Sequence, residues 1–487
     1  MCFLMNNIRV CYLGGQRKTI FRFLEVREMY ILKRHSVKYI CAFMFIILVC
    51  SFAFADYNVL KIPDSSEVRG DLLETWFFAP LEMVRHNEPE IRNNRIGEKF
   101  KIYHEETDDT FSILVCPCMQ IEMEVYSDKG NFTTVQDMYP KDAPGSWVLV
   151  RSKSTGAPLY IRCYFSNESD VFVQFSPYKN QGVADFLIYN CYAAKSFQTG
   201  IPFERFYTAS FAEMQKWTQN ILPWSYTEIY SGNYYPSLQM VEVIRENLDK
   251  VVFTEDAMYD GDNEPVYISS GKKRAVNEGL EDKVTVNGLG FLKWIGDGLI
   301  FPLTGTHLKR DPLIEETVSY KKTGLQGVVS EKNAIFMSLD WIRNLASAIV
   351  SIKNRRNFLY SELGVDVQVE PFTAQLTDVG VENTIGFTAN SGYVVSTLKP
   401  LLYVLAVSEP DNFFFGAIRQ TDRTRSPEIT FFNDGVVLFP YFDAKNRFNC
   451  IIFKDGEEIP FDSFVEKYSN DFIFLVRVHS SNQFVLE

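Results

Sequence analysis

Three carboxylates stand in otherwise apolar parts of the sequence, at Asp297, Asp340 and Asp366. Burial raises the pKa of such a group, and a carboxyl that stays protonated can act as an acid catalyst. Glycosidases need two carboxylates about 5–10 Å apart. These residues therefore support one hypothesis, a carboxylate-dependent hydrolase that acts on cell-wall or carbohydrate substrates.

The same residues also have a structural interpretation. Asp340 would lie in the first turn of a helix, where the helix dipole stabilises a negative charge. It is three residues from Arg343, a spacing at which the two can pair on one helix face. His307 follows Gly305-Thr306 in a loop, and we expect it to be a surface histidine. We take five residues as candidate binding residues: Trp294, Asp297, His307, Asp340 and Arg343. The catalytic residues, if any, are not identified.

Motifs of several enzyme classes are missing from the sequence. It has no G-x-S-x-G elbow, no H-E-x-x-H zinc motif, no phosphate-binding P-loop and no complete dinucleotide-binding glycine set. No cofactor and no metal are therefore expected. The acidic stretch 256–264 has oxygen ligands but lacks the spacing of a calcium-binding EF-hand loop, so a solvated turn is expected there.

The stretch from Asn287 to Trp294, NGLGFLKW, resembles the start of the nucleophile helix of the NlpC/P60 papain-like cell-wall peptidases. In that family an Asp-Cys-Ser-Gly-Phe type of motif carries the catalytic cysteine. Gly288 stands at the cysteine position here, and the strand 433–438, the nearest analogue of the histidine strand, has no histidine. The resemblance thus implies a degenerate, non-catalytic relative.

Strands are expected to dominate the chain from about residue 57 to 194. Short runs such as FKIYHEE, FSILVCP and PLYIRCYF are rich in β-branched and aromatic residues and are separated by turn residues. In the last of these runs, polar and apolar side chains alternate as in a half-buried strand. The spacing predicts an N-terminal antiparallel β-sandwich or barrel, and we take the sandwich as the prediction.

Helical periodicity begins after this region. Ser210 with Glu213 forms a capping-box pattern, and Pro236 opens a second helix. Two apolar helices are expected at 289–300 and 338–352, with Ser338 as the cap of the second. A short helix and several strands follow residue 392. The predicted fold class is α+β, with a β-sandwich at 56–200, a helical connector at 201–270 and an α+β domain with a mixed or antiparallel sheet at 271–487.

The N-terminal 55 residues read as a leader. A basic flank precedes the apolar run from Ile40 to Val49, and Ala53-Phe54-Ala55 is a small-x-small site. We predict a signal peptide at 29–55 with cleavage between Ala55 and Asp56, and residues 1–28 as an over-extended start. An uncleaved anchor, or lipidation at Cys50, remains an alternative.

Composition limits the partners and the redox chemistry. Residues 1–55 hold eight Lys and Arg and two Asp and Glu, so a chain starting at Asp56 has a net charge of −18 instead of −12. Such a surface repels phosphate backbones, and we expect no nucleic-acid partner. Five cysteines follow the leader, an odd number without regular spacing. We expect buried thiols, although a bridge from the Cys116/Cys118 pair to Cys163 or Cys191 stays open.

These features predict an exported protein of the periplasm or cell surface. Blocks such as Gly145-Ser146-Trp147-Val148-Leu149 and SLDWIRNL at 338–345 resemble an uncharacterised family of exported spirochaete proteins, which implies no known activity. The leading hypothesis is a non-catalytic binding or structural protein of the envelope, with a cell-wall glycan or peptide as partner. Contact with a membrane would run only through an uncleaved or lipidated N-terminus. The hydrolase is the alternative.

Overall fold

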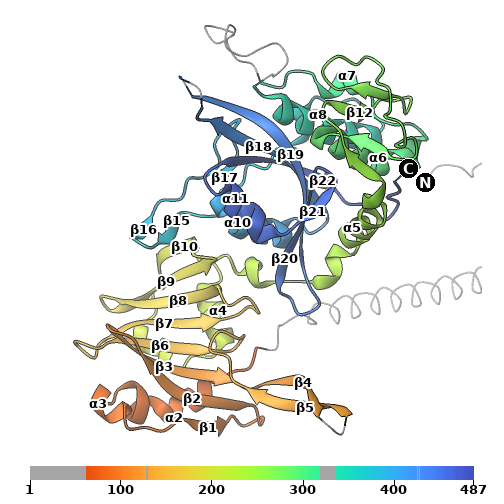
Figure 1. The fold of residues 1–487 in the computed structure, drawn as a ribbon. Coiled ribbons are helices and arrows are strands. Elements are labelled where there is room, and N and C mark those ends of the chain that lie inside the picture. The colour runs from red at the N-terminus through yellow and green to blue at the C-terminus, as the bar shows by residue number, and fades with distance from the viewer. Residues whose placement is uncertain (1–61, 128–129, 319–334, 425, 427, 487) are drawn as a thin grey trace, which may run out of the picture. The chain divides into compact units, whose positions relative to one another are not determined.

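The computed structural model describes residues 62–127, 130–318, 335–424, 426 and 428–486. Residues from Ile62 onward belong to one compact unit. Its strands pair almost entirely antiparallel, and most of its longer helices lie between two large sheets in the sequence, so the α+β class is confirmed (Figure 1). The predicted leader, including Ala55 and Asp56, lies outside the described residues.

The first sheet has ten antiparallel strands in the order β1-β2-β3-β6-β7-β8-β9-β10-β15-β16 (Figure 1, orange to yellow for all but the last two). Buried and partly exposed side chains alternate along its strands. In β7, Ile161 and Cys163 are fully buried while Tyr160 and Arg162 are half-buried. The bounds are β1 Glu90–Asn93, β2 Lys99–Glu106, β3 Thr110–Pro117, β6 Trp147–Ser152, β7 Pro158–Tyr164, β8 Val171–Tyr178, β9 Gln181–Ile188, β10 Cys191–Gln198, β15 Ala374–Thr377 and β16 Gly380–Glu382. A separate hairpin joins β4 Met119–Ser127 to β5 Gly130–Met138.

In the part of the chain that the structure describes, helical segments instead of a second sheet form the layer that packs on this sheet. The segments are α2 Ser66–Leu72, η1 Leu73–Phe77, α3 Leu81–Val84, η2 Phe203–Tyr207, α4 Phe211–Thr218 and η3 Trp224–Thr227. Their aromatic side chains share one core with the sheet; Phe206, for example, stacks on Phe175 at 4.1 Å between ring centroids. The α+β class stands, but the two-sheet sandwich is corrected, because helices carry the aromatic residues that a second sheet would have provided.

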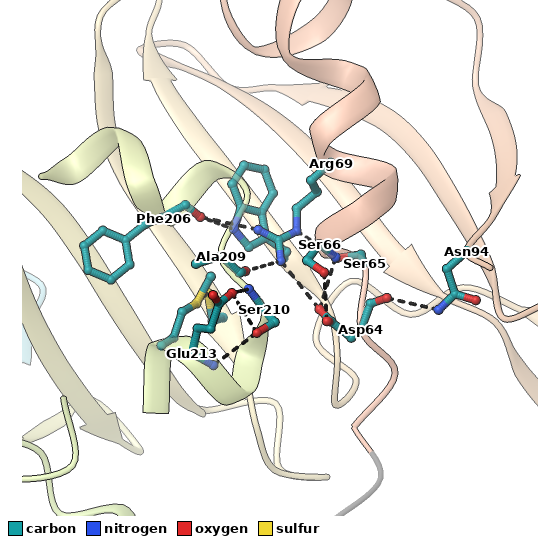
Figure 2. A network of polar contacts seen from close by, with 12 residues as sticks. Asp64, Ser65, Ser66, Arg69, Asn94, Phe206, Ala209, Ser210 and Glu213 are labelled. Atoms are coloured by element: carbon teal, nitrogen blue, oxygen red, sulfur yellow. Dashed lines mark hydrogen bonds and ion pairs between the residues drawn. The ribbon is translucent and has the colours of Figure 1, made fainter. Parts of the chain in front are cut away.

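Arg69 holds the helical layer together (Figure 2). Its side chain is fully buried and donates from Nη1 to Tyr207 O at 2.7 Å and from Nη2 to Ala209 O at 2.6 Å. These carbonyls lie at and just beyond the end of η2, where helical carbonyls lack partners. Directly afterwards Ser210 caps α4 in a complete capping box with Glu213, which confirms that prediction. Arg69 thereby joins the first helix of the unit to the segment that follows the first eight strands of its sheet.

The rest of the unit packs helices against a six-stranded sheet of order β17-β22-β18-β19-β20-β21 (Figure 1, mostly blue). Its strands are β17 Tyr393–Val394, β18 Asn412–Asp422, β19 Ile429–Phe442, β20 Phe448–Lys454, β21 Glu457–Ile459 and β22 Phe472–His479. The helices are η4 Ser231–Tyr234, α5 Tyr235–Asn247, η5 Leu248–Lys250, α6 Gly288–Thr304, α7 Arg310–Leu313, α8 Met337–Lys353, α9 Tyr360–Leu363, η6 Val395–Thr397, α10 Leu398–Ser408 and α11 Phe461–Tyr468. Two small ribbons pair β11 Val251–Phe253 with β14 Val284–Val286 and β12 Ala257–Tyr259 with β13 Pro265–Tyr267.

Helices α6 and α8 form the second core with β18, β19 and β22. Asn287 caps α6 by accepting a hydrogen bond from Gly290 N, and Gly305 ends it in the left-handed conformation. Ser338 does not cap α8 as expected. It lies inside the helix, which begins one residue earlier, and its hydroxyl donates to Phe432 O instead.

Among the described residues, no helix is both long and apolar enough to cross a membrane. The acidic stretch 256–264 contains β12, where Ala257 and Met258 are buried, and the turn that leads into β13, so the expected turn is only its second half. Among the described residues the cysteines are free thiols, so the bridge left open above is not formed. They are Cys116, Cys118, Cys163, Cys191 and Cys450.

Candidate ligand-binding cleft

A cleft of about 230 Å³ opens beside α6, and three of the five candidate residues line it. They are Trp294, Asp297 and His307. The other lining residues are Tyr259, Asn263, Glu281, Asp282, Lys283, Val284, Val286, Gly290, Lys293, Gly298, Phe301 and Val485. The cleft thus draws on α6, on the loop after it, on β12 and β14 with their connections, and on residues near the C-terminus.

A buried ion pair lies in this cleft. Lys293 Nζ is 2.6 Å from Asp297 Oδ2, and the two side chains are only 1% and 9% exposed. They are four residues apart on α6, the spacing that puts side chains on one helix face. The second carboxylate oxygen of Asp297, Oδ1, accepts a hydrogen bond from Leu308 N at 2.7 Å. Both oxygens of Asp297 therefore have a partner, and the carboxylate is held in one orientation.

His307 completes the polar group. Its Nδ1 lies 3.7 Å from Asp297 Oδ2, and its ring stacks on Phe301 with centroids 4.9 Å apart. Burial raises the pKa of Asp297, while Lys293, Leu308 N and His307 act in the opposite direction. His307, expected as a surface residue, is only 14% exposed in its side chain.

The rim of the cleft carries negative charge. Glu281 and Asp282 are exposed, in the connection that leads into β14. The backbone N–H of Glu281 itself and then that of Gly279, at 3.0 Å, lower the pKa of the Glu281 carboxyl by hydrogen bonding to it. Lys283, the cation beside them, donates to Asp249 O at 2.9 Å. Two exposed carboxylates therefore border a cleft whose cation lies deep inside.

The segment 484–486 crosses α6 at Gly298, and its residue Val485 lines the cleft. Val485 N donates to Gly298 O at 3.1 Å, and a Cβ on Gly298 would lie 2.6 Å from Cε2 of Phe484. Only glycine allows this close approach. The side chain of Val485 is half exposed and lines the cleft.

The other two candidates, Asp340 and Arg343, lie elsewhere, on α8. Arg343 does not pair with Asp340. Its guanidinium binds both carboxylate oxygens of Asp366, through Nε–Oδ1 at 3.1 Å and Nη2–Oδ2 at 2.8 Å, a two-point contact that the i−3 residue Asp340 does not make. Asp340 instead accepts from the backbone and hydroxyl of Thr317, at 2.8 and 2.6 Å. Burial raises the pKa of Asp340, and the Thr317 donors oppose this rise.

Arg343 and Asp366 border a second cavity of about 380 Å³. The guanidinium also donates to Thr317 Oγ1 and Asn390 Oδ1 and lies over the rings of Tyr360 and Phe474. The guanidinium of Arg343 is therefore bound by groups of the protein itself. We therefore assign Asp340, Arg343 and Asp366 to a structural network that fixes α8 against β22.

Gly288 stands at the cysteine position of the NlpC/P60 resemblance and begins α6. There is no room for a side chain at this position. A Cβ at this position would lie 2.5 Å from Asp455 Oδ1. Asp455 and Asp434 both pair with Lys454. A side chain at residue 288 would have to displace this charged group. The resemblance itself stays a prediction.

Cofactor and metal ligands can be assessed from the same geometry. No group of three or more His, Cys, Asp or Glu side chains is placed to hold a metal ion within the described ranges. Asp297 and His307 approach one another, but the third charged group beside them is the ammonium of Lys293, which repels a cation.

Lys293 is the residue that the sequence analysis missed. The signal was present, because Lys293 and Asp297 are opposite charges at i and i+4 in a helix that is otherwise almost entirely apolar. Tyr259, Glu281 and Asp282 could not be found in this way, since only the fold brings their segments to α6.

Comparison with known families gives one match. Residues 58–226 are similar to a family described as a domain of unknown function (DUF8515). This stretch contains α2, the strands β1 to β10 and α4, and the contacts of Arg69 join its beginning to its end. The cleft lies outside it. Neither the curated proteins nor the solved structures give a match to the chain.

Proposed function

We propose that this chain is an exported, non-catalytic binding protein of the cell envelope, and that the cleft beside α6 is its ligand site. The observation that carries the proposal is the buried Lys293–Asp297 pair inside a cleft with aromatic side chains. Binding sites typically combine apolar walls with a few fixed polar groups. Exchanging a buried ion pair for well-packed apolar residues is often neutral or stabilising, so stability alone gives little reason for one here.

The cleft supports binding better than hydrolysis. An acid catalyst needs a carboxyl that can present its proton to the substrate. Asp297 has one oxygen on Lys293 and the other on Leu308 N. The other carboxylates at the cleft, Glu281 and Asp282, are exposed at its rim, where water stabilises their charged form. We therefore retain the hydrolase only as an outcome that the experiment must be able to detect.

The binding proposal is tested by filling the cleft. Purified protein beginning at Asp56 is titrated with soluble envelope components, namely glycan fragments, peptides and amino acids, and ligand binding is followed as a rise in the thermal unfolding midpoint. We expect Val485→Trp to abolish the rise, because the new ring enters the cleft from an exposed position while the backbone bond to Gly298 is kept.

Val379→Trp is the matched control, since Val379 is 84% exposed between β15 and β16 and does not line the cleft. Ligands that bind both variants equally would place the site elsewhere. Release of cleaved product by the wild type, lost in Asp297→Asn, would establish the hydrolase.

The export proposal has its own measurement. N-terminal sequencing of the protein recovered from the envelope fraction should begin at Asp56, because Ala53-Phe54-Ala55 is the small-residue site that signal peptidases cut. Ala55→Leu should leave the leader attached. A chain recovered from the cytosol with an uncut leader contradicts export.

A further inference from the structure

The second cavity, which Arg343 and Asp366 border, has the size of a ligand site. Its volume of about 380 Å³ lies within the roughly 300–1,000 Å³ that is typical of small-molecule sites. Residues of α8, of α9, of the segment 364–368 and of the loop 387–390 line it. None of them lines the cleft beside α6, so the two cavities are separate.

Two arginines fix the groups around this cavity. Arg343 binds both oxygens of Asp366 and donates from Nη1 to Asn390 Oδ1 at 3.1 Å. Arg477 donates to the carbonyl oxygens of Gly364 and Asp366, at 2.5 and 2.8 Å. The lining is therefore held in place before a ligand arrives, which reduces the conformational entropy that binding costs.

The charges that line the cavity neutralise each other. Among the described residues of the lining, Arg343 and Asp366 are the charged ones, and they pair at 2.8 Å with side chains that are 4% and 11% exposed. A charged ligand would lose hydration here without gaining an opposite charge that is free to pair with it. The cavity therefore favours an uncharged ligand.

Other polar groups of the lining are available for hydrogen bonds. The side chains of Ser361 and Gln368 make no hydrogen bond to the described part of the chain, and neither does Nδ2 of Asn390, whose Oδ1 is bound to Arg343. An amide offers two N–H donors and a carbonyl acceptor, and a hydroxyl both donates and accepts. Ligand hydroxyls, which also donate and accept, match this set.

Tyr360 and Phe387 add aromatic surface to the same lining. Aromatic side chains bury apolar surface well, and the C–H face of a sugar ring is such a surface. We infer that this cavity binds a neutral sugar residue, with its hydroxyls at Gln368, Asn390 and Ser361 and its ring against the two aromatic side chains. The inference goes beyond the proposed function, because it assigns a second site that does not depend on the cleft beside α6.

Sugars that differ in charge test the ligand class. The protein beginning at Asp56 is titrated calorimetrically at pH 6 with glucose and N-acetylglucosamine, which are neutral, and with glucuronate and glucosamine, which carry a negative and a positive charge on the same ring. We expect a neutral sugar to bind and its charged counterparts to bind about tenfold more weakly, because their charge is buried without a partner.

Variants of the lining test the place of binding. Gln368→Met keeps the length of an exposed side chain but removes its amide, and it should weaken binding about tenfold through the loss of two hydrogen bonds. Ala389→Trp brings a large ring into the cavity from an exposed position and should abolish binding. The matched control is Ala444→Trp, since Ala444 is exposed in the turn between β19 and β20 and does not line the cavity.

The outcomes separate this inference from the proposed function. Binding of a neutral sugar that is lost in Ala389→Trp and kept in both Ala444→Trp and Val485→Trp supports the inference. Binding that is lost in Val485→Trp but kept in Ala389→Trp overturns it and supports the cleft beside α6 instead. Tighter binding of a charged sugar, an equal loss in Ala389→Trp and Ala444→Trp, or no binding of either neutral sugar also overturns it.

Discussion

Replacing Arg69 by methionine is expected to lower the free energy of unfolding by about 3–5 kcal/mol. The guanidinium supplies the hydrogen bonds of two buried carbonyls, Tyr207 O and Ala209 O, and hydrogen bonds to charged groups are worth about 1.5–3 kcal/mol each. Phe206 O loses less, because the indole of Trp147 also donates to it. Urea denaturation followed by fluorescence measures the change.

The loss should come from the buried contacts and not from the positive charge. Arg92→Met is the matched control, because Arg92 pairs with Glu90 at 2.9 Å while both side chains are about one-third exposed. Exposed ion pairs contribute about 0–1 kcal/mol. Similar losses in both variants would show that the carbonyls of η2 find other donors and that Arg69 does not hold this layer together.

This contact also gives a physical meaning to the matched family region. Without Arg69, α2 would keep its apolar packing through Val68 and Leu72 and the exposed contact of Glu67 with Arg95. The Arg69 side chain connects α2, which precedes the strands, to the segment 207–209, which follows them. The two ends of the matched region are therefore joined by direct contacts, and β15 and β16 are added to its sheet from far along the sequence.

Local pattern predicted the elements of this protein well. The alternation in β7 and the capping box of α4 depend on neighbours in sequence, and both are found as expected. The spacing that suggested a sandwich is equally compatible with one large sheet. Strand periodicity predicts which residues face a core, but it does not predict which elements pack against them. Here these elements are helices such as α4.

Long-range pairing accounts for what the sequence could not predict. Arg343 had a partner available at i−3, but it binds Asp366, 23 residues away, because that carboxylate presents both oxygens. The addition of β15 to β10 pairs Tyr192 with Ala374 and has no local signal at all. In the cleft, Trp294 and Asp297 on α6 and His307 after it were predicted, whereas Lys293 was missed and the rim residues come from segments that only the fold brings to α6.

Lys293→Met is the second variant with a large expected effect, a loss of about 3–5 kcal/mol in the free energy of unfolding at pH 7. The substitution leaves Asp297 buried without its cation, and breaking a buried ion pair from one side costs about this much. The double variant Lys293→Met/Asp297→Asn should recover most of the loss. The asparagine Oδ1 can still accept the bond from Leu308 N, and no charge remains buried.

The pH dependence identifies the cause of this loss. Burial already raises the pKa of Asp297 in the folded protein, and removal of Lys293 raises it further. The folded state then holds a proton that the unfolded chain releases above its ordinary pKa near 3.8, so stability falls as the pH rises through that window. Lys293→Met should therefore be less destabilised at pH 5 than at pH 7, and the double variant should lack this difference. A loss in Lys293→Met that is equal at both pH values would assign it to packing of the lysine stem instead of to the uncompensated carboxylate.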